Sequence, residues 1–311
     1  MTVNLLLTGA TGFVGSRVAD AARRQDGVRL RSLSRRTPPP GTGAEADHVH
    51  GNLADPRSLY GSCAGADVLV HCASSIGGGP ETAVAVNDRG TRALVDEAVR
   101  HGVRRIVYVS TAAVYGRGPF HGVRPGEVPL APASATSRTR AAAERHVLDA
   151  GGLVLRPHLV YGEGDRWVVP GLVGLMRELS ATVTGCEALH SMIDVATLGR
   201  AVVAAALSPT PASGVHHVNH PEPVSCSELL AAVCGQVAAP GGGAAVDVTT
   251  ARERAAGSPS ARHHLAMLTV DHWFADDTFW KDLDCDPGEG FATAFSRAAP
   301  WYRSFLRSGE G

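Results

Sequence analysis

The chain has 311 residues, 44% of them hydrophobic, and a formal net charge of −1. This length suits one large α/β unit or two closely joined domains, and the balanced charge excludes the basic surface typical of nucleic-acid or membrane-surface binding. No apolar run is long enough to span a membrane and no export signal precedes the first strand, so we expect a cytoplasmic protein. Six cysteines without C-x-x-C or metal-ligand spacing predict reduced thiols and no metal site.

Short apolar strands alternate with amphipathic helices in the first half of the chain. The predicted elements are, in order, a strand over 3–8, a helix over 13–24, a strand over 28–33, a short helix over 56–60, a strand over 67–72, a helix over 82–101, a strand over 105–110, a helix over 138–150 and a strand over 153–156. This alternation predicts an α/β fold, a Rossmann-type, doubly wound parallel sheet with helices on both faces.

The second half is less regular. We predict helices over 170–179, 198–207 and 227–237, a strand over 215–219, a loop over 238–245 and an acidic, aromatic-rich tail over 272–280. A soft boundary near residue 160 divides the chain into a Rossmann domain, residues 1–160, and a smaller C-terminal substrate-binding lobe, residues 161–311. Some later elements are expected to return to the sheet.

A glycine-rich turn, T-G-A-T-G-F-V-G, follows the first strand and opens the first helix. Gly9 permits the tight turn, Gly12 lets the backbone approach a pyrophosphate at the helix N-terminus, and Gly15 allows close packing of helix on sheet. The context of strand, turn and helix makes this a strong signal for a dinucleotide. The residues of the turn expected to bind it are Gly9, Thr11, Gly12, Phe13, Val14 and Gly15.

The end of the second strand indicates which dinucleotide binds. NAD sites usually place an acid about 20 residues after the turn, where it holds the ribose 2′-hydroxyl. Here the strand ends in Ser34, Arg35 and Arg36 instead. The serine can donate to a phosphate oxygen and the arginines offer permanently charged, planar forks to a 2′-phosphate. The alternative is two solvated arginines in a loop. We predict NADPH as the cofactor.

Further short motifs occur along nearly the whole chain. They are G-N-L at 51–53, V-H-C-A-S at 70–74, N-D-R-G-T at 87–91, V-Y-V-S-T-A-A-V-Y-G at 107–116, R-P-H-L-V-Y-G at 156–162, M-I-D-V-A at 192–196 and P-G-E-G-F…W-Y-R at 287–303. With the glycine turn, they resemble the extended short-chain dehydrogenase/reductase family, which contains nucleotide-sugar epimerases, dehydratases and ketoreductases. The resemblance implies that Asn52 and Leu53 flank the adenine, that Ala73 lies along the cofactor, and that Pro157 to Leu159 pass the nicotinamide amide.

The resemblance also implies a catalytic Ser or Thr, a Tyr, and a Lys four residues after the Tyr. Thr111 matches the first, with Ser110 beside it. Glu144 matches the Glu usually found four residues after the Lys, which places Arg140 at the Lys position and Thr136 at the Tyr position. The single lysine is Lys281 and residue 277 is Asp, so the chain contains no Tyr-x-x-x-Lys. A threonine hydroxyl is too weak an acid to replace the tyrosine, although Arg140 can still hold the ribose.

Three explanations stay open. The first is a reductase of an aromatic polyketide ketone, in which the proton comes from water or from a phenol of the substrate itself. The second is an NDP-sugar ketoreductase or epimerase with a rebuilt acid, for which His158, Asp194 and Tyr161 are candidates. The third is a non-enzymatic NADPH sensor.

The partners we expect are few. We expect the protein to bind a small-molecule ketone and to bind neither nucleic acid nor a membrane. We expect it to be a monomer or a homodimer. Aromatic residues gather toward the C-terminus and form either apolar walls for a flat ligand or the core of the smaller lobe. These residues are Trp167, Trp273, Phe274, Phe279 and Trp280.

Overall fold

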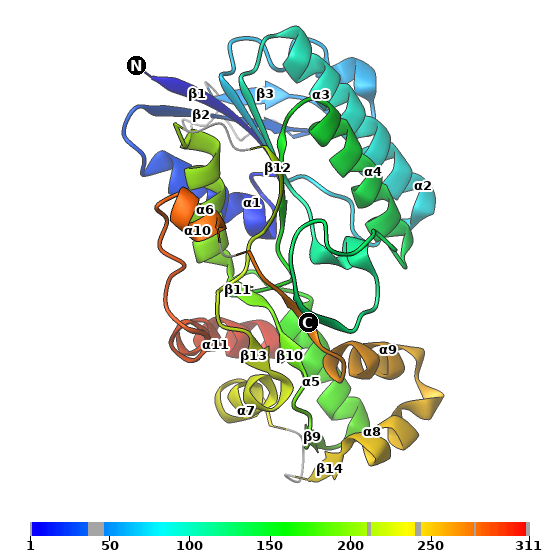
Figure 1. Cartoon of the computed structure of the whole chain (residues 1–311). Helices are drawn as coiled ribbons and strands as arrows, with labels where there is room; N and C mark the ends of the chain where they lie inside the picture. The colour runs from blue at the N-terminus through cyan, green and yellow to red at the C-terminus, as the bar shows by residue number, and fades with distance from the viewer. Residues whose placement is uncertain (1, 37–46, 210–212, 240–243, 277, 309–311) are drawn as a thin grey trace.

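The computed structural model describes residues 2–36, 47–209, 213–239, 244–276 and 278–308. A larger lobe, built on a sheet with helices on both faces, adjoins a smaller, mainly helical lobe (Figure 1). The first lobe holds the glycine turn, and the second holds most of the chain after residue 160.

Seven parallel strands form the large sheet, in the order β12-β7-β5-β4-β1-β2-β3. They are β1 (Val3–Thr8), β2 (Val28–Ser34), β3 (His48–His50), β4 (Val68–His71), β5 (Arg105–Val109), β7 (Leu153–Arg156) and β12 (Gly214–His217). The central strands are apolar on both faces because helices cover both, which confirms the predicted parallel sheet.

Each face of the sheet has its own helical layer. α1 (Phe13–Arg23) and α6 (Val195–Leu207) pack on one face. They approach so closely that a Cβ on Gly199 would lie 2.7 Å from the backbone carbon of Arg17. The other face carries α2 (Gly79–Ala83), the π-helical segment η2 (Val84–Gly90), α3 (Thr91–Arg100) and α4 (Ala135–Asp149). The fold is therefore the predicted doubly wound, Rossmann-like one.

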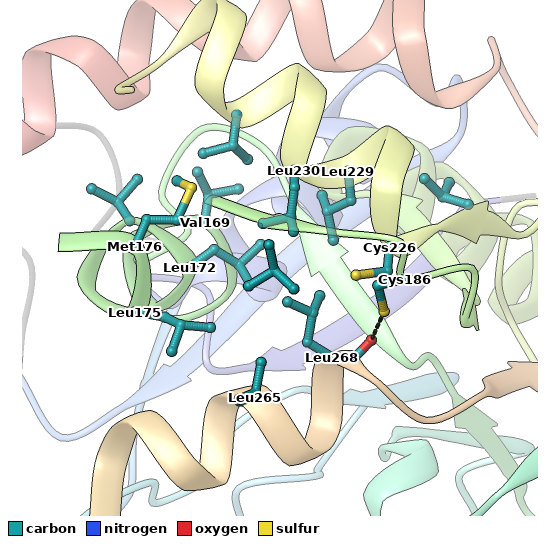
Figure 2. Close-up of a cluster of buried hydrophobic side chains, with 14 of the residues drawn as sticks. Val169, Leu172, Leu175, Met176, Cys186, Cys226, Leu229, Leu230, Leu265 and Leu268 are labelled. Carbon is teal, nitrogen blue, oxygen red and sulfur yellow. Dashed lines mark hydrogen bonds between the residues drawn. The ribbon is translucent and has the colours of Figure 1, made fainter. Parts of the chain in front are cut away.

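The smaller lobe has a separate apolar core between its helices (Figure 2). The helices are α5 (Val168–Leu179), α7 (Cys226–Gln236), α8 (Val248–Arg254), α9 (Pro259–Leu268) and α11 (Phe291–Arg307). Short strands complete the lobe and its junction with the sheet: β6 (Phe120–Val123), β8 (Leu159–Tyr161), β9 (Thr182–Thr184), β10 (Leu189–His190), β11 (Met192–Asp194), β13 (Val224–Ser225), β14 (Ala245–Asp247) and β15 (His272–Phe274). In the described ranges no helix has the length and apolarity needed to cross a membrane.

The chain passes between the lobes more than once. β12 and α6 come after residue 160 but belong to the large sheet and its helical layer. β6 comes before it but pairs with β15, far along the sequence. Elements from both sides of residue 160 thus meet where the lobes join, and the boundary itself stays a prediction.

Several elements differ from the sequence prediction. The helix expected over 82–101 is three segments, because the π-helical turn directs Asn87 at the loop after β4. The tail over 272–280 begins with a strand, β15, since its apolar residues pair across the lobe junction. β14 takes up Ala245, the last residue of the predicted 238–245 loop, and residues 240–243 lie outside the described ranges. α8, α9 and α11 were not predicted.

Candidate active site

The site lies at the carboxyl ends of β1 and β4, where the strand order reverses direction. From β1 the chain proceeds to β2 and β3 on one side, and from β4 to β5 and β7 on the other. In open α/β sheets, ligands bind in the crevice outside the strand ends at this point. The glycine turn follows β1, and Ala73 follows β4.

The glycine turn has the close approaches that the sequence predicted. Gly9 has a φ of 75°, and a Cβ on it would lie 2.7 Å from the nitrogen of Ala73. A Cβ on Gly15 would lie 2.0 Å from the carbonyl oxygen of Gly9. α1 starts after Gly12 without a side-chain cap, and among the described residues no side chain accepts from its first amide groups. This bare helix N-terminus fits a pyrophosphate.

The other residues of the turn are less enclosed. Thr11 is exposed, and Phe13 and Val14 are half-buried. Phe13 lies under the loop after β8, where a Cβ on Gly164 would lie 3.1 Å from its ring. Arg17, one turn further along α1, pairs with Glu163 of the same loop at 3.0 Å.

The loop after β4 is held by two buried side chains that the sequence prediction did not single out. His71 lies 2.6 Å from the hydroxyl of Thr8 and 2.9 Å from that of Thr91. Burial, with a contribution from the charge of Arg140, lowers the pKa of His71 to about 3, so this ring stays neutral. Asn87 accepts from the Ser75 amide at 2.7 Å and donates to its carbonyl at 3.1 Å. Both residues lie within quoted motifs, V-H-C-A-S and N-D-R-G-T, which were the available signal.

The residues predicted for the adenosine end lie along the edge of the sheet. The hydroxyl of Ser34 donates to the Arg36 carbonyl at 2.8 Å, so its proton is used inside the turn and does not face a phosphate. Arg35 and Arg36 are exposed, and their side chains have no hydrogen-bond or ion-pair partner in the described part of the chain. Asn52 accepts from the Ala54 amide at 3.1 Å. Leu53 is buried in the core beneath α3.

Arg140 lies where the resemblance places a lysine, on α4 near the end of β5. Its guanidinium donates to the Val109 carbonyl and lies 5.6 Å from the centre of the Tyr108 ring. Its Nε is buried and has no partner among the described residues, and this unsatisfied donor fits a ribose hydroxyl. Thr136, one turn earlier on α4, is half-buried, and among the described residues no group hydrogen-bonds its hydroxyl. Thr111, after β5, accepts from the Ala113 amide at 3.2 Å as the cap of η3 (Ala112–Tyr115).

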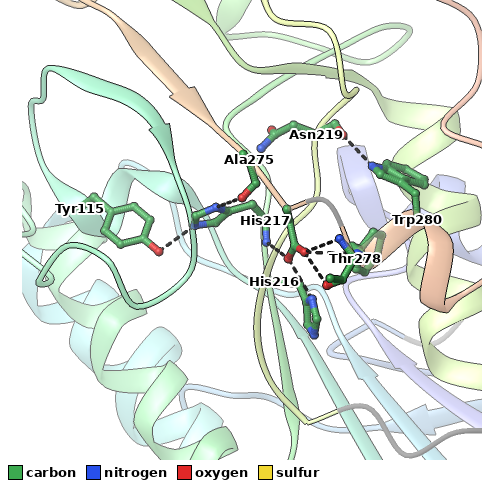
Figure 3. Close-up of polar contacts among 9 residues, drawn as sticks. Tyr115, His216, His217, Asn219, Ala275, Thr278 and Trp280 are labelled. Carbon is green, nitrogen blue, oxygen red and sulfur yellow. Dashed lines mark hydrogen bonds and ion pairs between the residues drawn. The ribbon is translucent and has the colours of Figure 1, made fainter.

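Ser110 and its neighbour Thr111 have different hydrogen-bond partners. It is buried and donates to Glu144, which also holds Arg156. Arg156 donates to the hydroxyl of Tyr115 at 2.6 Å, and that hydroxyl lies 2.7 Å from Nε2 of His217 (Figure 3). Since Nδ1 of His217 donates to the Ala275 carbonyl at 3.1 Å, its Nε2 accepts from the tyrosine. Ser110 therefore belongs to a buried network, whereas Thr111 is half-buried and caps η3.

His158 follows Pro157, which is buried at the end of β7 and accepts from the Ala112 amide at 2.8 Å. The His158 backbone donates to Asn219, and its ring stacks on His272 with centroids 5.5 Å apart. Burial, with His190 and His272 nearby, lowers the pKa of His158 well below its usual range. The ring is neutral at physiological pH, so it can donate a hydrogen bond but is not a protonated acid.

The other candidates for a rebuilt acid are structural. Asp194 caps α6 by accepting from the Thr197 amide at 3.0 Å. Tyr161 is buried in the core of the smaller lobe, which raises the pKa of its hydroxyl. Two of the C-terminal aromatic residues, Phe274 and Phe279, are buried, and the half-buried Trp280 donates its indole N–H to the Asn219 carbonyl at 3.0 Å (Figure 3).

Cavities and metal-type clusters do not define this site. A cavity of about 560 Å³ lies at the opposite, amino end of the sheet, between Val3, Gly27 and Ile106. Within the described ranges, no group of His, Cys, Asp or Glu is arranged to hold a metal ion. The site is therefore defined by the topology of the sheet and the side chains at its carboxyl edge.

Known proteins resemble this chain in sequence and in fold. The chain is 27% identical over 317 residues to the 2-alkyl-3-oxoalkanoate reductase of Stenotrophomonas maltophilia, covering 92% of this chain and 95% of that protein. It is 36% identical over 162 residues to the ceramide reductase of Caulobacter vibrioides, covering 51% and 47%. The fold matches UDP-glucuronic acid 4-epimerase from Bacillus cereus in complex with NAD, with a TM-score of 0.72 and 17% identity over 97% of this chain and 99% of that one.

A family model matches most of the chain. Residues 5–219 match the model described as the NAD dependent epimerase/dehydratase family. That span covers the glycine turn, α4 with Arg140 and the strand end at His158. The relatives and the family together identify an oxidoreductase with a nicotinamide dinucleotide as cofactor. This chain belongs to the NAD-dependent epimerase/dehydratase family.

Proposed function

We propose that this protein is an NADPH-dependent ketoreductase that reduces a ketone of an aromatic polyketide-type natural product to a secondary alcohol, without a Tyr/Lys pair. The observation that carries the proposal is Arg140, whose buried and unpartnered Nε lies where the family places a lysine. An arginine there holds a ribose but does not supply a proton. The chain resembles the angucyclinone ketoreductase of simocyclinone biosynthesis in lacking both residues of the pair.

Two groups of residues support NADPH as the cofactor, one at the start of α1 and one after β2. The bare N-terminus of α1 fits the pyrophosphate, and the exposed Arg35 and Arg36 fit a 2′-phosphate. No acid lies at the end of β2 to favour an unphosphorylated ribose. NADPH supplies the hydride when it is bound.

The protein residues position the ketone rather than protonate it. Thr111 and the neutral His158 lie at the ends of β5 and β7, where each can donate a hydrogen bond to a carbonyl oxygen. The proton that the new alkoxide oxygen needs comes from a phenol of the substrate beside the carbonyl, or from water. An internal phenol has the right acidity and needs no side chain to hold it, because it is already hydrogen-bonded to the ketone.

Two observations support an apolar substrate. The names of several relatives specify lipid-like compounds: 2-alkyl-3-oxoalkanoates, sterol carboxylates and ceramide. Exposed apolar side chains also occur on loops that follow the strands: Ile76, 56% exposed, after β4, and Trp167, 63% exposed, after β8. A flat aromatic ketone would cover such side chains on binding.

The test uses matched substrates. Purified protein is mixed with NADPH and an angucyclinone ketone bearing a free phenol beside the carbonyl, and loss of the reduced-nicotinamide absorbance is followed. We expect turnover with this ketone, and a fall in kcat of about a hundredfold when the phenol is O-methylated, because the internal proton is lost. Equal turnover of both ketones overturns the internal-proton mechanism.

Two further outcomes overturn the proposed function itself. Oxidation of NADPH only with NDP-4-keto sugars indicates the sugar ketoreductase instead. Tight NADPH binding without oxidation by any ketone indicates a sensor.

A further inference from the structure

The two histidines of β3, His48 and His50, lie beside the end of β2, where the exposed arginines begin. The strands pair in parallel, with Ser32 opposite His48 and Ser34 opposite His50. Residues two apart in a strand face the same side, so Ser34 and both histidines share one face. β3 is the edge strand of the sheet, next to the strand end at which a Rossmann fold holds the adenosine ribose.

His48 holds the arginine turn through Ser34. The Ser34 hydroxyl donates to the Arg36 carbonyl at 2.8 Å, and Nε2 of His48 lies 3.0 Å from the same hydroxyl oxygen. A hydroxyl has a single proton, so Nε2 must carry the hydrogen and donate it to Ser34. The relay from His48 through Ser34 to the Arg36 carbonyl fixes the backbone that carries both arginines.

His50 is placed to reach a ligand directly. The Gly51 amide donates to the Ser34 carbonyl at 3.1 Å, which continues the strand pairing past His50 and keeps the His50 backbone next to the end of β2. The ring is exposed, and within the described ranges no residue hydrogen-bonds it. Asp47, the acidic residue adjoining β3, is paired with Arg29 at 3.4 Å and so does not oppose the arginines.

We propose that these histidines complete a 2′-phosphate subsite, in which His50 contacts the phosphate and His48 positions the Arg35–Arg36 turn through Ser34. The inference rests on the proposed NADPH preference and extends it to a second strand. A phosphate monoester carries up to two charges and three acceptor oxygens, which guanidinium and imidazole N–H donors match. Strand pairing alone brings the two histidines to the arginines.

The experiment compares phosphorylated and unphosphorylated ligands on the full chain. Dissociation constants are measured by calorimetry for NADPH, NADH, 2′-phospho-ADP-ribose and ADP-ribose. We expect His50→Gln to weaken both phosphorylated ligands by about tenfold, the loss of one charge-assisted hydrogen bond, and to leave the other two within about twofold.

His48→Ala should weaken the phosphorylated ligands similarly. His48→Gln, whose amide can still donate to Ser34, should restore most of the affinity. His263→Gln, an exposed histidine on α9, is the matched control and should change nothing. Restoration by Gln is a result that general loss of folding would not give.

The outcomes separate this inference from the proposed function. If the wild type prefers NADPH and neither His50→Gln nor His48→Ala changes the preference, the histidine subsite is overturned while the NADPH assignment stands. If His48→Ala weakens all four ligands equally, His48 is only structural and its positioning role is overturned. If the wild type binds NADH as tightly as NADPH, both the subsite and the NADPH assignment fail, and ketone reduction is then tested with NADH.

Discussion

Glu144 and Arg156 form a buried, two-pronged ion pair that ties α4 to the end of β7. Nε of Arg156 lies 2.9 Å from one carboxylate oxygen and Nη2 lies 2.6 Å from the other, with side chains 6% and 1% exposed. α4 carries Thr136 and Arg140, and His158 follows β7. The pair therefore fixes the two sides of the proposed active site relative to each other.

Removing one partner of this pair should be costly. Glu144→Ala leaves the Arg156 charge buried and uncompensated, so we expect the free energy of unfolding to fall by about 3–5 kcal/mol. Urea denaturation measures the change. Asp96→Ala breaks the exposed Arg92–Asp96 pair on α3 and should change stability by less than about 0.5 kcal/mol. An equal loss of unfolding free energy in the two variants would show that the buried pair stabilises the fold no more than the exposed one.

A methyl group at Gly15 should destroy the glycine turn. The added Cβ would lie 2.0 Å from the Gly9 carbonyl oxygen, which forces the turn and α1 apart. We expect Gly15→Ala to abolish cofactor binding by calorimetry. Gly174→Ala in α5, where the Cβ meets nothing within 4 Å, should keep binding and stabilise the fold by up to about 1 kcal/mol. Cofactor affinity within threefold of wild type in Gly15→Ala would contradict the assigned turn.

The double variant Arg35→Ala/Arg36→Ala should discriminate between cofactors. Both guanidinium groups are exposed at the end of β2, so their removal should not disturb the core. We expect NADPH affinity to fall at least tenfold, from the loss of charge-assisted contacts to a phosphate, with little change for NADH. An equal loss for both cofactors would remove the NADPH assignment.

Thr136→Ala should leave turnover largely intact. The family resemblance places its hydroxyl at the position of the usual tyrosine, and a threonine hydroxyl is too weak an acid to supply a proton. We expect kcat within about threefold of wild type in steady-state assays with the phenolic ketone, because the proton comes from elsewhere. A loss exceeding a hundredfold would overturn that mechanism.

The stability of the protein should fall in mild acid because buried histidines, His71 and His217 among them, stay neutral in the fold. Burial lowers the pKa of His71 to about 3 and that of His217 to about 4. An unfolded histidine has a pKa of about 6.5, so below that pH only the unfolded state takes up these protons. Each histidine therefore lowers the unfolding free energy by up to about 1.4 kcal/mol per pH unit, from pH 6.5 down to its folded pKa.

Urea unfolding at pH 5.0, 6.0 and 7.0 measures this dependence. His217→Gln should reduce the slope between pH 5 and 6.5, whereas the exposed His263→Gln should keep it. The same slope in wild type and His217→Gln would show that His217 does not carry the effect.

The sequence contained enough local information to predict most of the sheet. The strand spans of β1, β4, β5 and β7 followed from apolar runs, because a strand covered on both faces has no polar positions to obscure it. The long helix before β5 was only partly predicted, since its π-helical turn depends on Asn87 reaching a loop elsewhere in the chain. The smaller lobe was predicted least well, because its short strands pair between segments as distant as β6 and β15.

The sequence by itself determined the glycine turn and the absence of a Tyr-x-x-x-Lys motif, since each depends on residue types at fixed spacing, whereas the placing of Arg140 at the lysine position rests on the family resemblance. The tertiary structure decided how the two neighbouring hydroxyls are bonded: Ser110 is buried and donates to Glu144, whereas Thr111 is half-buried and accepts from the Ala113 amide. It also decided that His158 is neutral and that His48 reaches Ser34. Burial and hydrogen bonding arise between segments that only the fold brings together, so these properties do not appear in any local pattern of residues.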